Sequence, residues 1–279
     1  MEIGKTQKLT VSRQAKLGWF LKNEAGTEAF IDEEFVPDEI AVGDTLDVFV
    51  YNIDNGKLIA TTEKPLVELD GYAALEVKKV TEFGAFLNWG ITDRDLLVPT
   101  VFQPYEFQEG EFHVVYLMIA EKSGKLIGNG MIENLIDNKV VDYEPGDKVN
   151  LLVYDESDLG MKVIINQKHK GLIYHNEIFK EILIGDSLRG YIKKVREDNK
   201  IDVSIEKFGY RKVELNTTKL LDAIVQNNGI LYLCDKSNPN EIYNELGISK
   251  KVFKKAVGAL LKDRKIKVDN EECKIELID

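Results

Sequence analysis

Three pairs of glycines recur along this chain at almost constant separation. The separations are 25, 26 and 25 residues, for the pairs Gly18 and Gly43, Gly84 and Gly110, and Gly160 and Gly185. In each copy the first glycine interrupts a short apolar stretch, as expected where a strand bulges or coils sharply. Short, strongly coiled strands favour a small barrel over a flat sheet. The repetition therefore predicts three small β-barrels in tandem.

The middle copy shows the strand pattern most clearly. Its strands are predicted over residues 75–80, 83–87, 96–98, 113–117 and 124–127. The first of them alternates apolar and polar residues, which is the period of a half-buried strand. The stretch 83–87, Phe-Gly-Ala-Phe-Leu, has counterparts at 17–21 and 159–163. Each copy is therefore expected to form the same kind of barrel.

The stretch at 83–87 and the apolar strand after it resemble the RNA-binding S1 domain, a five-stranded OB-fold barrel. In that family the two phenylalanines of the stretch lie on the face that stacks on RNA bases, and the resemblance assigns this role to Phe83 and Phe86. Stacking of a base on an aromatic ring contributes roughly 1–3 kcal/mol and tolerates many sequences. The alternative interpretation is that both rings belong to the barrel core.

The first copy differs from the middle one in its chemistry. Leu17 replaces the aromatic residue before the glycine, although Trp19 and Phe20 follow it, and acidic residues gather at 32–34 and 38–39. Phe20 is a candidate RNA contact. A barrel that packs against other parts of the chain or docks another protein is an equal alternative for this copy.

The third copy has Leu159 and Lys162 where the middle copy has its phenylalanines. Tyr174 falls where S1 domains often carry a histidine that joins the aromatic pair. Basic residues interleaved with a ring favour a groove that follows a nucleic-acid backbone. The candidate contacts are Lys162, Lys168, Lys170, Tyr174, Lys193, Lys194 and Arg196. A solvated, lysine-rich surface is the alternative.

The period changes to that of helices after residue 215. A helix capped by Thr217 or Thr218 is expected first, then a short strand at 230–233 and a second helix from Asn238-Pro239 to Gly247. A third helix follows Ser249, with its apolar face formed by Val252, Phe253, Val257, Leu260 and Leu261, and a hairpin closes the chain. This order resembles a winged-helix domain. The resemblance implies nucleic-acid contacts from the third helix and the wing, at Lys250, Lys251, Lys254, Lys255, Arg264 and Lys265. Winged helices also dock proteins, which is the alternative.

The net charge of −11 is unevenly distributed along the 279 residues. Residues 1–70 carry −7 and 71–146 carry −6, whereas 147–212 carry +2 and 213–279 are neutral. Phosphate contacts need lysine and arginine, so an RNA footprint is expected in the second half. Cys234 and Cys273 show no metal-ligand spacing and suggest no disulfide framework, which favours a reducing cytoplasm. Without a signal-like or membrane-spanning segment, no membrane partner is expected.

The whole chain resembles the conserved virulence factor B family of bacterial RNA-binding proteins. The resemblance is carried by Phe-Gly-Ala-Phe-Leu-Asn-Trp-Gly at 83–90, by Gly-Lys-Leu-Ile-Ala-Thr at 56–61, and most specifically by 235–260. It implies RNA binding in post-transcriptional control, without catalysis or cofactor. We therefore expect a multidomain, mainly β protein with a C-terminal α+β domain: three S1-like OB-fold barrels at 1–66, 67–144 and 145–212, then a winged helix at 213–279.

Enzyme motifs are missing from the sequence. There is no GxSxG, GxxxxGK[ST] or HExxH pattern, and Asp93 with Asp95 is a weak candidate for a nuclease metal pair. We expect no metal, cofactor or small-molecule substrate. The expected partner is single-stranded RNA bound with low sequence specificity, with DNA as a further candidate for the winged helix. The alternative is an adaptor whose acidic barrels dock the ribosome or RNA polymerase.

Overall fold

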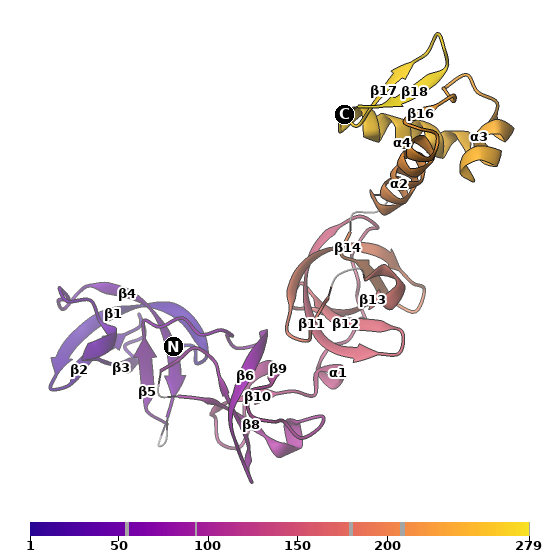
Figure 1. Cartoon of the computed structure of the whole chain (residues 1–279). Helices are drawn as coiled ribbons and strands as arrows, with labels where there is room; N and C mark the ends of the chain where they lie inside the picture. The colour runs from indigo at the N-terminus through magenta and orange to yellow at the C-terminus, as the bar shows by residue number, and fades with distance from the viewer. Residues whose placement is uncertain (54–55, 93, 179–180, 207–209, 279) are drawn as a thin grey trace. The chain divides into compact units, whose positions relative to one another are not determined.

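Residues 1–205 contain the three predicted repeats, and each repeat forms an OB-type β-barrel (Figure 1). The computed structural model describes residues 1–53, 56–92, 94–178, 181–206 and 210–278, with the side chains of 210–215 outside that description. The first barrel closes in the order β1-β2-β3-β5-β4. Its strands are β1 (Lys5–Ala15), β2 (Gly18–Lys22), β3 (Glu28–Asp32), β4 (Thr45–Asn52) and β5 (Leu58–Thr61). A bulge between Val11 and Arg13 bends β1 so that it pairs with both β2 and β4.

The third barrel repeats this topology in the order β11-β12-β13-β15-β14. Its strands are β11 (Lys148–Ser157), β12 (Gly160–Ile165), β13 (His169–Tyr174), β14 (Ser187–Val195) and β15 (Ile201–Ser204). In both barrels the third and fifth strands pair in parallel, with Phe30 opposite Ile59 and Gly171 opposite Ile201. A short 3₁₀ turn follows the third strand of every barrel, at η1 (Glu33–Phe35), η3 (Thr100–Phe102) and η4 (His175–Glu177).

The second barrel is hydrogen-bonded as an open sheet in the order β10-β9-β6-β7-β8. Its strands are β6 (Tyr72–Thr81), β7 (Gly84–Asn88), β8 (Leu96–Pro99), β9 (Phe112–Ile119) and β10 (Leu126–Asn129). Its two edge strands meet by packing: a Cβ added to Gly128 of β10 would lie 2.7 Å from Val98 Cγ2 of β8. The expectation of three barrel-like domains is confirmed, although in the middle one β8 and β10 are not hydrogen-bonded to each other.

The first glycine of each repeat lies directly under the third strand. A Cβ on Gly84 would lie 2.2 Å from the carbonyl oxygen of Val98, closer than real Cβ atoms come to any atom. The same approach occurs at 2.1 Å between Gly18 and Ile31 and at 2.0 Å between Gly160 and Ile173. The repeated glycine is therefore a steric requirement of the barrel, which explains its recurrence.

Within residues 1–205, neighbouring barrels contact each other through ring packing and hydrogen bonds. Phe49 and Tyr51 of the first barrel pack edge-on against Trp89 of the second, with ring centroids 5.6 and 6.2 Å apart. Between the second and third barrels, the backbone N–H of Tyr72 donates to Gln167 Oε1 at 2.7 Å, and Gln167 Nε2 donates to the Tyr72 carbonyl at 3.1 Å. Residues 1–205 therefore form one compact unit, and 206–279 a second.

The second unit is a winged helix. Its elements are α2 (Tyr210–Gln226), β16 (Ile230–Leu231), α3 (Pro239–Leu246), α4 (Lys250–Lys262), β17 (Ile266–Asp269) and β18 (Lys274–Leu277). Asn238 begins α3 with a reciprocal capping pair to Glu241, and Gly247 ends it in the left-handed conformation at φ 63°. Leu220, Ile242 and Phe253 are completely buried where the three helices meet.

Three details of this unit correct the sequence predictions. Helix α2 begins at Tyr210, because no proline or glycine interrupts 210–226 and a threonine is compatible with a helix interior. The predicted boundary at 212/213 therefore falls inside a helix, and the compact units divide after Ile205. The apolar face of α4 also differs from the prediction: Leu261, which was expected on it, is 43% exposed, and Ala256, which was not, is buried there.

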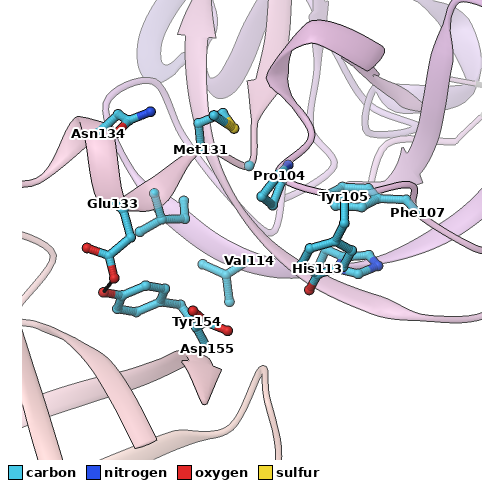
Figure 2. A pocket seen from close by; sticks show the side chains of 12 residues that line it. Pro104, Tyr105, Phe107, His113, Val114, Met131, Glu133, Asn134, Tyr154 and Asp155 are labelled. Carbon is cyan, nitrogen blue, oxygen red and sulfur yellow. Dashed lines mark hydrogen bonds between the residues drawn. The ribbon is translucent and has the colours of Figure 1, made fainter. Parts of the chain in front are cut away.

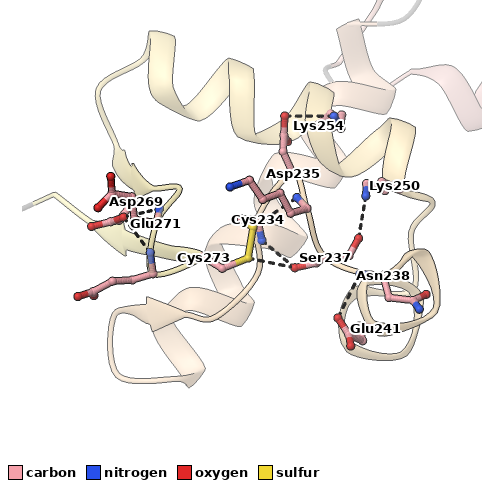
Figure 3. Close-up of a disulfide and its surroundings, with 12 residues drawn as sticks. Cys234, Asp235, Ser237, Asn238, Glu241, Lys250, Lys254, Asp269, Glu271 and Cys273 are labelled. Carbon is pink, nitrogen blue, oxygen red and sulfur yellow. Dashed lines mark hydrogen bonds and ion pairs between the residues drawn. A yellow bond between two sulfur atoms is a disulfide. The ribbon is translucent and has the colours of Figure 1, made fainter.

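The cysteines also correct an expectation, since Cys234 and Cys273 form a disulfide (Figure 3). They are 39 residues apart in the chain, but β18 pairs with β16 and brings their Cα atoms to 4.8 Å. That separation suits a disulfide. The bond joins the segment before α3 to the hairpin.

Candidate nucleic-acid interface

Phe83 lies at the turn between β6 and β7 with 71% of its surface exposed. Its backbone is fixed on both sides. Its N–H donates to Thr81 Oγ1 at 3.3 Å, and its carbonyl accepts from the N–H of Thr100 at 3.2 Å. Thr81 Oγ1 also donates to the Gly84 carbonyl at 3.0 Å. A fixed backbone with a ring in solvent is the geometry of a stacking platform, and it excludes the core interpretation for Phe83.

Phe86 projects from β7 on the outer face of the second barrel and is half-buried. In the antiparallel ladders it is opposite Lys79 of β6 on one side and Leu97 of β8 on the other. Lys79 is exposed, and no ion pair to it is found among the described residues. The sequence analysis missed Lys79, although the pairing of β6 with β7 places it beside Phe86.

Tyr105 is a second exposed ring near this turn and was not predicted. It is 53% exposed and lines a groove of about 370 Å³ that also includes Thr81, Thr100 and Gln103. Its ring packs edge-on against Phe107 and His113, at 6.0 and 5.5 Å between centroids. It lies in an irregular loop, where no periodic signal reveals which side chains face outward.

The other side of Tyr105 lines a crevice of about 190 Å³ between the second and third barrels (Figure 2). His113 stacks on Phe107 with centroids 3.6 Å apart, and its Nε2 lies 2.9 Å from Glu111 Oε2. This hydrogen bond lowers the pKa of the Glu111 carboxyl. Across the crevice, Tyr154 of β11 donates its hydroxyl hydrogen to Glu133 at 2.9 Å.

In the first barrel, Phe20 is already covered. The guanidinium carbon of Arg13 lies 3.6 Å above the centroid of the Phe20 ring, and Arg13 also pairs with Glu28 at 2.8 Å. Phe30 packs edge-on against Phe20 at 5.5 Å between centroids. A base would have to displace Arg13 to stack on this face. Phe20 is therefore less available for stacking than Phe83.

Two of the candidate lysines in the third barrel are held by a carboxylate from outside it. Lys162 of β12 lies 2.9 Å from Glu133 and 2.9 Å from Asp155. Lys170 of β13 lies 3.1 Å from the same Glu133. Glu133 belongs to α1 (Ile132–Leu135), in the connection between the second and third barrels.

The other candidates in this barrel divide into paired and unpaired groups. Arg196 forms a 2.7 Å ion pair with Asp202 and donates to the Tyr174 hydroxyl, while Lys193 pairs with Glu177. Lys193 Nζ and Arg196 Cζ lie 5.8 and 5.9 Å from the centroid of the Tyr174 ring. Within the described part of the chain, Lys168 and Lys194 are exposed and have no ion pair. The basic groove predicted here is therefore largely neutralised by carboxylates of the chain itself.

The six candidate basic residues of the winged helix divide in the same way (Figure 3). Lys250 donates to the Ser237 carbonyl at 2.8 Å, and Lys254 pairs with Asp235 at 3.1 Å. The remaining four are exposed without an ion pair to any residue that the structure describes: Lys251, Lys255, Arg264 and Lys265.

Among the described residues, no three His, Cys, Asp or Glu side chains are placed to hold a metal ion. Asp93, one of the two aspartates considered for a nuclease pair, lies outside the described residues. No helix in the described part of the chain is long and apolar enough to cross a membrane.

Each OB-type barrel has an exposed apolar residue at the turn between its first two strands, and a winged helix follows the barrels. This arrangement defines a multidomain protein assembled from modules of the nucleic-acid-binding type. Residues 3–63 match the S1 domain, and residues 218–277 match the CvfB-like winged helix domain. Both domain types are typically non-catalytic. The chain matches the conserved virulence factor B family, as its sequence resemblance predicted.

The chain is also similar to proteins over most of its length. The chain is 26% identical over 277 residues to the uncharacterized protein YitL of Bacillus subtilis (strain 168), covering 97% of this chain and 92% of that protein. It is 25% identical over 239 residues to conserved virulence factor B of Staphylococcus aureus (strain USA300), covering 83% and 79%. A crystal structure of a multidomain protein with nucleic acid binding domains from Streptococcus pneumoniae TIGR4 matches at 24% identity and a TM-score of 0.43, covering 99% and 98%.

Proposed function

We propose that this protein binds single-stranded RNA with low sequence specificity and acts, without catalysis, in post-transcriptional regulation. The observation that carries the proposal is Phe83, a ring that is 71% exposed on a fixed turn of a barrel of the S1 type. The matches to the S1 domain and to the CvfB-like winged helix domain support nucleic-acid binding.

Binding at the second barrel combines stacking with a small number of phosphate contacts. One base stacks on Phe83 and the next on Phe86, each contributing roughly 1–3 kcal/mol. Lys79, opposite Phe86 in the β6–β7 ladder, supplies a cation for a neighbouring phosphate. Glu82 and Glu106 line the adjoining groove and limit how strongly a backbone is attracted there. Because every base has an aromatic face, such a platform discriminates weakly between sequences.

Phosphate contacts elsewhere come from the exposed, unpaired cations. Among the candidate residues that the structure describes, these are Lys168 and Lys194 in the third barrel and Lys251, Lys255, Arg264 and Lys265 in the winged helix. Each phosphate neutralised on a single strand contributes about −0.7 to the slope of log affinity against log salt. The winged helix is also the module through which DNA would compete.

A second candidate function is favoured by the first barrel. Its acidic residues at the end of β3 and beyond are all exposed, and Arg13 covers Phe20. They are Asp32, Glu33, Glu34, Asp38 and Glu39. This surface suits a basic protein partner, such as a protein of the ribosome or RNA polymerase, better than a phosphate backbone.

An equilibrium titration separates the two functions. Labelled single-stranded RNA, single-stranded DNA of the same sequence and duplex RNA are each titrated with the full chain at two salt concentrations. The proposal predicts that single-stranded RNA binds most tightly and that part of its affinity persists at high salt through stacking. Absence of binding to any strand at low salt would refute RNA binding and leave the adaptor function.

A further inference from the structure

The connection between the second and third barrels is hydrogen-bonded to the third barrel. Asn138 forms three of the hydrogen bonds involved: its Nδ2 donates to the Lys170 carbonyl at 2.8 Å and to the Asn199 carbonyl at 3.0 Å, and its Oδ1 accepts from the Lys170 N–H at 3.0 Å. Asn199 Nδ2 returns a bond to the Lys139 carbonyl at 3.3 Å. Residues 132–139, which we call the connecting segment, thus lie against β13 and the β14–β15 turn.

The carboxylate of Glu133 is the charged centre of this contact. Oε1 accepts from Lys162 and from the Tyr154 hydroxyl, each at 2.9 Å, and Oε2 accepts from Lys170 at 3.1 Å. Lys170 Nζ also donates to the Glu133 carbonyl at 3.2 Å. Figure 2 shows the Glu133 side chain directed at Tyr154. Two anionic oxygens that accept from two ammonium groups and a hydroxyl reproduce the environment of a bound phosphate.

This contact covers the face that the second barrel uses for stacking. Lys162 is opposite Asp155 and Leu172 in the ladders of the third barrel, as Phe86 is opposite Lys79 and Leu97 in the second. The turn is also equivalent: Ser157 Oγ donates to the Gly160 carbonyl at 2.9 Å, as Thr81 does to Gly84.

A cleft of about 670 Å³ lies beside the contact. The third barrel lines it with four basic side chains and two acidic ones: Lys162, Lys170, Arg196 and Lys200, and Asp198 and Asp202, which pair with Lys200 and Arg196. Asp137, Asn138 and Lys139 of the connecting segment form part of its wall. The barrel side of the cleft therefore has more basic than acidic side chains, and the connecting segment bounds the other side.

We propose that the connecting segment closes a second nucleic-acid site on the third barrel, with Glu133 occupying the position of a backbone phosphate of a single strand. The proposal rests on the proposed function and adds a regulation to it. Release of residues 132–139 frees Lys170 for the phosphodiester backbone and leaves Asp155 as the carboxylate partner of Lys162. The second barrel binds first, and the third barrel engages only when a strand displaces the segment.

The direct test is Glu133→Gln in the full chain, titrated with a labelled uridine-rich single strand. Removing the charge weakens the hold on both lysines, so the affinity should rise at least about fivefold. Glu181→Gln is the matched control, since it removes the same charge from an exposed position of the third barrel.

The same substitution in a Phe83→Ala/Phe86→Ala background separates this proposal from the proposed function. Restored binding there supports the second site. If wild type binds through the phenylalanines and Glu133→Gln has unchanged or weaker affinity, the segment is only a structural connection and the proposal is overturned. If neither wild type nor any variant binds a strand, the proposed function fails with it.

Hydrogen exchange on the wild-type chain provides a test that needs no variant. The Lys170 N–H is bonded to the side chain of Asn138, so displacement of the connecting segment exposes it. A saturating strand should accelerate exchange at Lys170 and in residues 132–139. Unchanged or slower exchange in both places would contradict displacement, even if Glu133→Gln failed to fold.

Discussion

The carboxylate of Glu133 lies 2.9 Å from the ammonium group of Lys162, so a residue outside the third barrel neutralises the position that corresponds to Phe86 in the second. Copies of one barrel have thereby acquired different surfaces. The second presents rings and a lysine without an ion pair to any described residue, the third presents two lysines engaged by Glu133, and the first covers its ring with Arg13. Differences in availability, more than differences in fold, distinguish the three barrels.

The Glu133 contact predicts a specific acid sensitivity. Burial acts to raise the pKa of Glu133, but hydrogen bonds from Lys162, Lys170 and Tyr154 outweigh it and lower the pKa to about 2, from a usual value of 4.5. A carboxyl with a lowered folded-state pKa stabilises the fold above its unfolded pKa and loses that contribution as the pH falls through the folded value. Asp155, which shares Lys162, is the other carboxylate at this contact.

Wild type should therefore lose more stability than Glu133→Gln between about pH 4.5 and pH 2, and the two should run parallel above pH 5. Urea unfolding at a series of pH values checks this, with Glu181→Gln as the control that follows wild type. Parallel curves for wild type and Glu133→Gln throughout would show that the ion pairs do not stabilise the folded chain.

Gly84→Ala should destabilise the second barrel strongly. The added Cβ would lie 2.2 Å from the Val98 carbonyl oxygen on a backbone with φ of +147°, so the β7–β8 pairing must shift. Steric overlap and backbone strain together cost about 2–5 kcal/mol. Gly258→Ala is the control, because the space around Gly258 in α4 is open and alanine favours a helix by about 1 kcal/mol. Thermal unfolding of both variants measures the contrast, and equal effects would refute the steric account.

The lysines of α4 should separate into structural and surface residues. Lys250→Ala removes the bond to the Ser237 carbonyl and should lower the stability of the winged helix by about 1–2 kcal/mol. Lys251→Ala/Lys255→Ala should leave stability within about 0.5 kcal/mol and reduce the salt slope of strand binding by about 1.4. Denaturation and salt-dependent titration of both variants test this. A stable Lys250→Ala that loses binding would invert the assignment.

Reduction of the Cys234–Cys273 disulfide should selectively destabilise the winged helix. Opening a loop that joins residues 39 apart typically costs about 2–4 kcal/mol. Circular dichroism at 222 nm follows this unit, because the helices of two turns or more in the described chain, α2, α3 and α4, all lie in it. Reductant should lower the melting temperature of wild type and leave that of Cys273→Ser unchanged. A wild-type melting curve insensitive to reductant would show that the bond does not form or does not stabilise the unit.

The barrels were predictable because their requirements are local. The third strand of each barrel passes so close to Gly18, Gly84 or Gly160 that a side chain does not fit there. The spacing of these glycines in the sequence therefore indicates the fold. The capping pair of Asn238 with Glu241 and the left-handed Gly247 likewise begin and end α3 where the sequence indicated.

The charge partners were not predictable, because the barrels bring together residues that are far apart in sequence. Nothing near Lys162 or Lys170 indicates that Glu133, on a preceding connection, would reach both. The disulfide depends in the same way on the pairing of β16 with β18. A sequence shows which residues can carry charge, whereas only the folded chain shows which charges remain available.

The central claim is that the exposed rings of the second barrel bind single-stranded RNA. Fluorescence anisotropy with a labelled uridine-rich strand, comparing wild type with Phe83→Ala/Phe86→Ala, tests it most directly. Leu17→Ala is the matched control, since Leu17 is 68% exposed at the equivalent turn of the first barrel. We predict that the double variant loses at least about tenfold in affinity, with its salt slope unchanged, and that Leu17→Ala binds like wild type. A folded double variant that binds as tightly as wild type would contradict the account.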